Sequence, residues 1–125
     1  MKLASPILAL MLVALVGCQT FYSGVVSLTR IVDDAAHEYA KLHLAGLVPP
    51  DVALKASVSH AEYRRAAGVL ADALEAVKAG KEVDTKPAWD AARAAANHFV
   101  DVLFGILTKA RVTELRAQIA KAGAP

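Results

Sequence analysis

The sequence contains little cysteine and few aromatic residues, and these shortages exclude several classes of protein. Its single cysteine, Cys18, leaves no disulfide framework within the chain. Aromatic residues make up only 6% of the chain. The seven glycines are scattered singly, so there is no glycine-rich phosphate-binding loop. The formal net charge is only +2, whereas a nucleic-acid-binding domain needs a strongly basic face.

The residues that usually perform catalysis do not form a recognisable pattern either. The four histidines are His37, His43, His60 and His98, and no two of them have the i, i+4 spacing of a helical metal site. No serine stands in a nucleophile elbow. The acidic residues occur as water-facing helix clusters rather than as paired catalytic carboxylates. We therefore expect no enzymatic activity, no cofactor, no metal and no small-molecule substrate.

An apolar leader stands at the start of the chain. Lys2 supplies a positive charge, an apolar run follows from Leu3 to Val16, and Gly17 precedes Cys18. This pattern is typical of a secretory signal peptide. The run of fourteen residues is too short to span a bilayer, which takes about 20. Leu15 stands at the position where an ordinary signal peptide usually has a small residue.

The four residues Leu15-Val16-Gly17-Cys18 resemble the lipobox of bacterial lipoproteins. The resemblance implies cleavage between Gly17 and Cys18, a diacylglycerol on the Cys18 sulfur and an acyl chain such as palmitate on its new amino group. Residues 1–17 would then be the signal peptide, and residues 18–125 a lipid-anchored domain. Each buried methylene contributes about 0.8 kcal/mol, so several acyl chains hold such a domain firmly on a membrane.

The same resemblance predicts where the protein is located. Lipoproteins belong to the bacterial cell envelope, and an Asp after the lipidated cysteine often retains them in the inner membrane. Gln19 follows Cys18 here, which favours the periplasmic face of the outer membrane. The inner membrane remains the alternative.

The remainder of the chain is rich in alanine and has apolar residues at alternating spacings of four and three, which is typical of amphipathic helices. We predict three helices, at about 20–46, 51–79 and 85–121. Gly46 and Gly80 are expected to end the first two, and Pro87 suits the first turn of the third. The predicted fold is an all-α, up-down-up three-helix bundle.

Two features of the third predicted helix suggest a surface for a protein partner. Apolar residues spread around the helix between Phe99 and Leu107, and the end of the helix, 111–121, is expected to project beyond its shorter neighbours. The candidate partner contacts are Phe104, Leu107, Val112, Leu115, Arg111 and Arg116. An alternative explanation for the two arginines is that cations favour the C-terminal ends of helices.

The chain is also similar to small helical lipoproteins that are often encoded among phage-like genes. The similar parts are the histidine-containing first helix, the segment Ala45 to Pro50, and the tyrosine- and alanine-rich second helix. We expect a non-enzymatic structural or protein-interaction module that docks an envelope protein. The alternative implied by this resemblance is an envelope exclusion factor of a prophage or mobile element.

The anchor and the alternating helix directions also predict an orientation. The first helix would leave the membrane, the second would return, and the turn 81–86 would lie near the lipid surface. Lys78, Lys81 and Lys86 are then expected to face anionic headgroups.

Overall fold

The protein is described by a computed structural model, which covers the backbone from Ser5 to Ala122 and the side chains from Ser23 to Ala122. This part of the chain is helical throughout and contains no β-sheet. The four helices are α1 (Ser5–Leu44), α2 (Pro50–Lys78), α3 (Lys86–Val102) and α4 (Lys109–Lys121). The predicted all-α class is confirmed.

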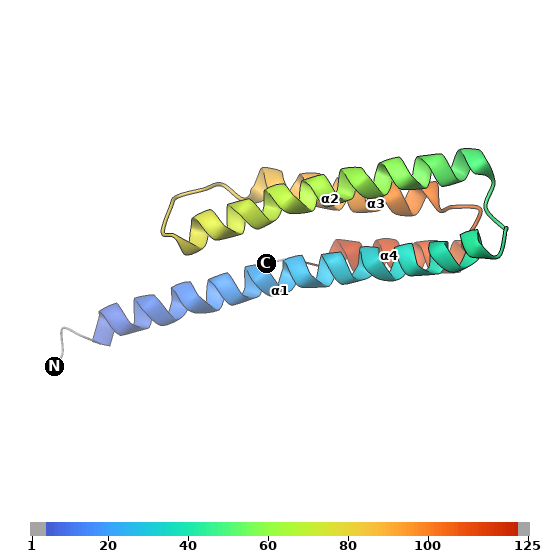
Figure 1. Cartoon of the computed structure of the whole chain (residues 1–125). Coiled ribbons are helices and arrows are strands. Elements are labelled where there is room, and N and C mark those ends of the chain that lie inside the picture. Colours follow the sequence, from blue (N-terminus) through green and yellow to red (C-terminus); the bar gives the residue numbers. More distant parts are fainter. Residues whose placement is uncertain (1–4, 123–125) are drawn as a thin grey trace.

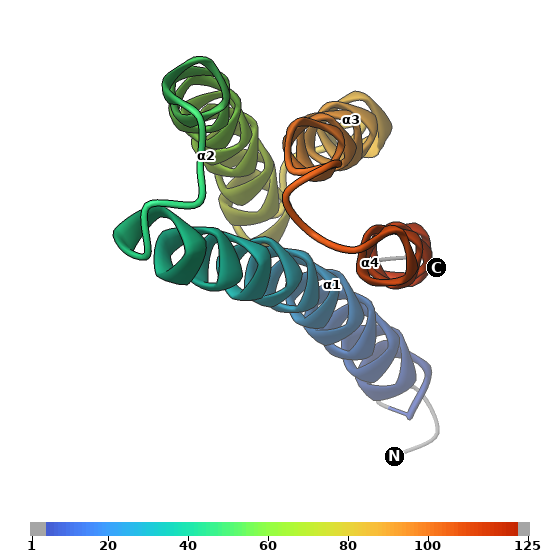
Figure 2. The same ribbon diagram turned by 90° about the vertical axis from the view of Figure 1, so that its right-hand side faces the viewer.

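The four helices pack side by side in alternating directions (Figure 1). Seen along the bundle, α2 and α3 lie on one side, and α1 and α4 lie on the other (Figure 2). The turns 45–49 and 103–108 are at the same end, which we call the distal end. The turn 79–85 is at the opposite end, which we call the proximal end (Figure 1).

The first two predicted helix ends match the structure. Gly46 and Gly80 follow α1 and α2 with φ of +74° and +80°, a conformation that residues with a side chain rarely adopt. Helix α2 begins at Pro50, and Pro87 lies in the first turn of α3. In both places proline is tolerated because the first-turn N–H groups have no partner within the helix.

The third predicted helix is wrong, because residues 85–121 form two helices. Helix α3 ends at Val102, and Gly105 adopts a φ of +97° that turns the backbone away. Helix α4 then begins behind Thr108, whose side-chain oxygen accepts a hydrogen bond from the Arg111 backbone N–H at 3.2 Å. The predicted three-helix bundle is thus a four-helix bundle in the part of the chain described.

The predicted overhang of residues 111–121 is also wrong, because α4 folds back along α1 and α3. Its three large apolar residues, Val112, Leu115 and Ile119, are fully buried. Burying a large aliphatic side chain contributes about 1.5–3 kcal/mol. A projecting helix would leave all three in water, and this difference favours the folded-back arrangement.

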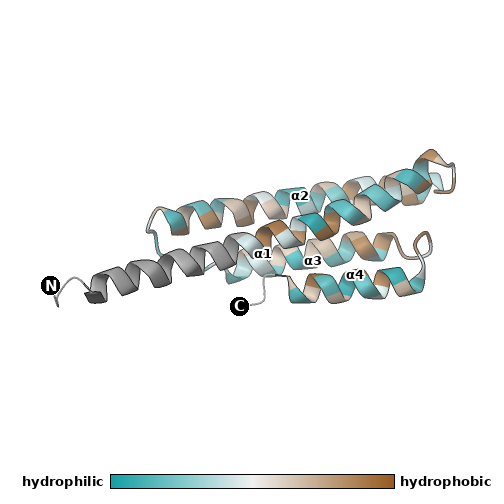
Figure 3. Cartoon of the chain, turned by 90° about the horizontal axis from the view of Figure 1, so that it is seen from below, coloured by the Kyte–Doolittle hydropathy of each residue, from teal (hydrophilic) through white to brown (hydrophobic). Residues whose placement is uncertain are grey.

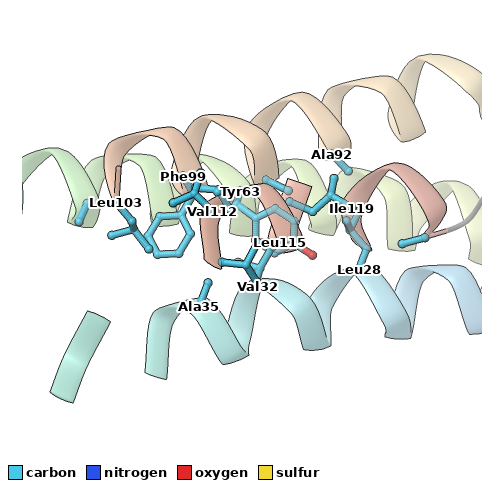
Figure 4. Packing of buried hydrophobic residues seen from close by; sticks show 14 of the residues in the cluster. Leu28, Val32, Ala35, Tyr63, Ala92, Phe99, Leu103, Val112, Leu115 and Ile119 are labelled. Carbon is cyan, nitrogen blue, oxygen red and sulfur yellow. The ribbon is translucent and has the colours of Figure 1, made fainter. Parts of the chain in front are cut away.

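The core lies between the two pairs of helices. Figure 4 shows side chains of α1, α3 and α4 pointing toward one another, with Phe99 among them. The apolar stripes predicted for the first three helices supply most of this core. Their fully or almost fully buried members are Leu28, Val32, Ala35, Ala56, Tyr63, Leu70, Leu74, Trp89, Ala92, Ala96, Phe99 and Leu103.

One side chain fastens the end of α4 to α3. The Arg93 guanidinium donates hydrogen bonds to the Ala122 carbonyl oxygen from Nη2 at 3.1 Å and from Nε at 3.4 Å. It also lies 5.2 Å from the centre of the Trp89 ring. The positive charge of Arg93 is favourable beside both groups, because the C-terminal end of α4 and the face of the Trp89 ring carry partial negative charge.

Candidate docking site

Exposed apolar side chains gather at the distal end of the bundle. Eight large hydrophobic residues are exposed in the described part of the chain, and five of them lie at this end. Figure 3 shows hydrophobic colouring at the distal turn between α1 and α2. Elsewhere the exposed large hydrophobic residues are isolated valines, which are common on protein surfaces, so this clustering sets the distal end apart. The five are Leu44, Leu47, Leu54, Val58 and Phe104.

Three of these five residues line an open groove between the start of α2 and the end of α3. The groove has a volume of about 750 Å³, and we call it the distal groove. Phe104 lines the groove with 57% of its surface exposed. The lining residues are Val52, Leu54, Lys55, Val58, Ser59, His98, Asp101, Val102 and Phe104.

The local sequence explains why apolar residues face outward here. In the first turns of α2 the buried residues are Ala56 and Ser59, so Leu54 and Val58 fall on a neighbouring face of the helix. At the end of α3 the backbone leaves the helix, so Leu103 enters the core while Phe104 points to solvent. The Phe104 N–H is still held by the Asp101 carbonyl at 3.1 Å, which fixes the turn.

Polar and charged side chains also line the groove. Asp101 forms an ion pair with Arg116 of α4, and this pair joins α3 to α4 beside Phe104. Lys55 and His98 also line the groove. The lining thus combines apolar and polar side chains, as many protein-binding surfaces do.

The structure places the six predicted partner contacts in very different surroundings. Val112 and Leu115 are core residues, so their prediction as surface contacts is wrong. Leu107 is half-buried and packs against the core. Of the four apolar candidates, only Phe104 is well exposed.

The two predicted arginines are held by carboxylates of the same chain. The Arg111 guanidinium lies 2.6 Å from the Glu38 carboxylate of α1 and 3.0 Å from that of Glu114, and the hydrogen bonds that it donates to Glu38 raise the pKa of Arg111 further. Arg116 pairs with Asp101. These pairs fasten α4 to α1 and α3, so both arginines have a structural role within the bundle.

Sequence reasoning missed Leu54 and Val58. They are four residues apart and lie outside the apolar stripe of α2. This spacing was the available signal for a second apolar face. A search for that stripe alone passes over them. Their neighbour across the groove, Phe104, was identified because it lies outside the stripe of its own helix.

A second, smaller hollow lies between α1 and α2. It has a volume of about 390 Å³, and its lining includes Thr29, Asp33, His60, Tyr63 and Arg64. The Thr29 and Tyr63 hydroxyls are 3.1 Å apart and hydrogen-bonded. Burial raises the pKa of Tyr63, the Thr29 hydrogen bond opposes that rise, and Asp33 adds to it.

Two of the four histidines lie against aromatic side chains. The ring of His43 stacks on Tyr39 with centroids 5.7 Å apart, and that of His60 lies 5.3 Å from Phe99. Within the described residues, no three His, Cys, Asp or Glu side chains are grouped so that they could hold a metal ion.

The predicted lipidation site lies outside the residues whose side chains are described. Gly17 and Cys18 belong to the backbone of α1, and the described side chains begin at Ser23. Among the residues described, none of the helices has both the length and the apolarity that crossing a membrane requires.

The chain was compared with protein-family models, with curated proteins and with solved structures, and none of them matches.

Proposed function

We propose that this protein is a lipid-anchored, non-enzymatic interaction module of the bacterial cell envelope. Acylated Cys18 would hold it at a membrane, with the periplasmic face of the outer membrane favoured by Gln19. The support for the anchor is the Leu15-Val16-Gly17-Cys18 motif behind an apolar leader. The bundle would then present a binding surface to an envelope protein.

The observation that supports docking is the exposed distal groove. The groove is lined by Leu54, Val58 and Phe104, each more than half exposed. Burying any of these side chains against a partner would lower the free energy, because apolar surface would leave water. A groove between two helices suits the apolar face of an amphipathic segment from another protein. The charged lining residues Lys55 and Asp101 would set the orientation of that segment.

The test is a comparison of two charged substitutions on the exposed surface. Phe104→Asp places a carboxylate in the groove, and Val69→Asp places one on the outer surface of α2, away from the groove lining. Neither side chain belongs to the core, so both variants should melt within a few degrees of the wild type. Full-length wild type and both variants are cross-linked in intact cells, and the cross-linked proteins are identified by mass spectrometry.

We expect a specific envelope protein to cross-link to the wild type and to Val69→Asp, and to be lost from Phe104→Asp. Burying an unpaired carboxylate at the centre of an interface costs several kcal/mol, so the loss should be at least tenfold. Equal recovery by all three proteins would show that the distal groove is not the docking surface.

A further inference from the structure

The helix register shows how far each helix reaches toward the proximal end. Helices α1 and α2 run in opposite directions, and the hydrogen bond between Thr29 and Tyr63 fixes these residues at the same level. Cys18 precedes Thr29 by eleven residues, which is about 16 Å of helix. Lys78 follows Tyr63 by fifteen residues, which is about 22 Å.

Helix α2 therefore ends about 6 Å beyond the level of the Cys18 backbone, and the turn 79–85 continues from there. Helix α3 returns from that turn at Lys86. If Cys18 is acylated, as proposed above, the proximal end must meet the membrane whenever the bundle stands upright.

The distance of about 6 Å by which α2 passes the level of Cys18, which we call the overlap, agrees with the polar composition of the proximal end. The polar headgroup layer on each side of a bilayer is about 5–7 Å thick, similar to the overlap of about 6 Å. The Cys18 side chain and the glycerol attached to it separate the helix backbone from the acyl chains. Residues 79–85 are mostly polar, which suits headgroups and opposes entry into the hydrocarbon.

The proximal end carries charges of both signs in nearly equal number. Between residues 75 and 90 there are three lysines and four carboxylates. Lys86 pairs with Asp90 at 2.8 Å, and Lys78 lies 3.8 Å from Glu75. Two of the three lysines expected to face anionic headgroups, Lys78 and Lys86, therefore already have a carboxylate partner. Mixed charges instead suit zwitterionic headgroups, which carry both a phosphate and an ammonium.

We infer that the proximal end, residues 75–90, rests in the zwitterionic headgroup layer of the membrane that holds Cys18. This inference depends on the proposed lipid anchor. Contact at the anchor and at the turn supports the bundle at two places. It stands upright and holds the distal groove away from the lipid.

The test uses the mature, acylated full-length protein in phosphatidylcholine vesicles. Acylation blocks the Cys18 sulfur, so a single introduced cysteine takes a spin label specifically. Lys81→Cys labels the proximal turn. Ser57→Cys is the control on α2, twenty-one residues before Lys78 and so about 32 Å farther from the membrane. Both positions are exposed, so neither label disturbs the core.

The measurement is spin relaxation by nickel chelated to lipid headgroups. We expect it to be several-fold stronger at position 81 than at position 57, and unchanged when anionic phosphatidylglycerol is added. Equal relaxation at both positions would mean that the bundle lies flat, and weak relaxation at both would mean that it swings free. Either result overturns the inference. Strengthening by phosphatidylglycerol would overturn the zwitterionic preference.

Failure of the anchor has a different signature. Mass spectrometry before reconstitution would show a product without acyl chains, and both the proposed function and this inference would then be overturned. An acylated product with equal relaxation at both positions overturns only the orientation.

Discussion

Individual residues determine how this bundle responds to pH. Tyr63 is almost fully buried between α1 and α2, and its hydroxyl bonds to Thr29. Burial raises the pKa of Tyr63, because a phenolate would lose its hydration there. The folded protein therefore keeps the Tyr63 proton at pH values where the unfolded chain has released it. The free energy of unfolding is therefore undiminished below about pH 10 and falls as the pH rises above it.

Tyr63→Phe tests this dependence. The variant lacks the ionisable group, so its free energy of unfolding should fall less steeply between about pH 9 and pH 11 than that of the wild type. At neutral pH the variant should be about 1 kcal/mol less stable, because the Thr29 hydroxyl loses its partner. Urea unfolding across the pH range measures both effects. Parallel pH profiles would contradict the role of Tyr63.

At the scale of elements, the apolar faces of the helices could be predicted from the sequence, whereas one connection between helices was missed. Each apolar stripe predicted for the first three helices packs into the core, because a run of four–three spacings can bury only one face. The break between α3 and α4 was missed, although its signals are present. Gly105 and Thr108 form a helix stop and a helix start within four residues. Helix length predicted that residues 111–121 would project, because the spacing of apolar residues does not show that a helix reverses.

The candidate site was predictable only in part, for a related reason. Phe104 could be identified because it lies outside its stripe. Leu54 and Val58 became a site only when the reversal of the chain placed α3 beside them. The positions of Arg111 and Arg116 depend on Glu38 and Asp101, which are 73 and 15 residues away in the sequence. A partner that is distant in the sequence produces no recognisable pattern in the residues around each arginine.

A pair of glycine substitutions tests the break between α3 and α4. Gly105→Ala forces a side chain into a φ of +97° and should destabilise the protein by about 1–2 kcal/mol. Gly68→Ala lies on the exposed face of α2, with nothing within 4 Å of the added carbon, and should stabilise it by about 0.5–1 kcal/mol. Thermal or urea unfolding measures both. A continuous helix through residue 105 would instead make both substitutions stabilising.

The whole molecule has two ends with different surfaces. The proximal end is polar, with charges of both signs, and lies beside the proposed anchor, whereas the distal end exposes most of the large apolar residues. Helices α1 and α2 join these ends. In the account proposed here, the length of the bundle places a docking groove at a set height above the membrane.

The anchor at Cys18 is the central claim, and intact-mass spectrometry of the protein extracted from its own membranes tests it most directly. The account predicts a chain that begins at Cys18 and carries a diacylglycerol on sulfur and an acyl chain on the amino group. A product that keeps residues 1–17, or one with a free Cys18 thiol, would contradict it.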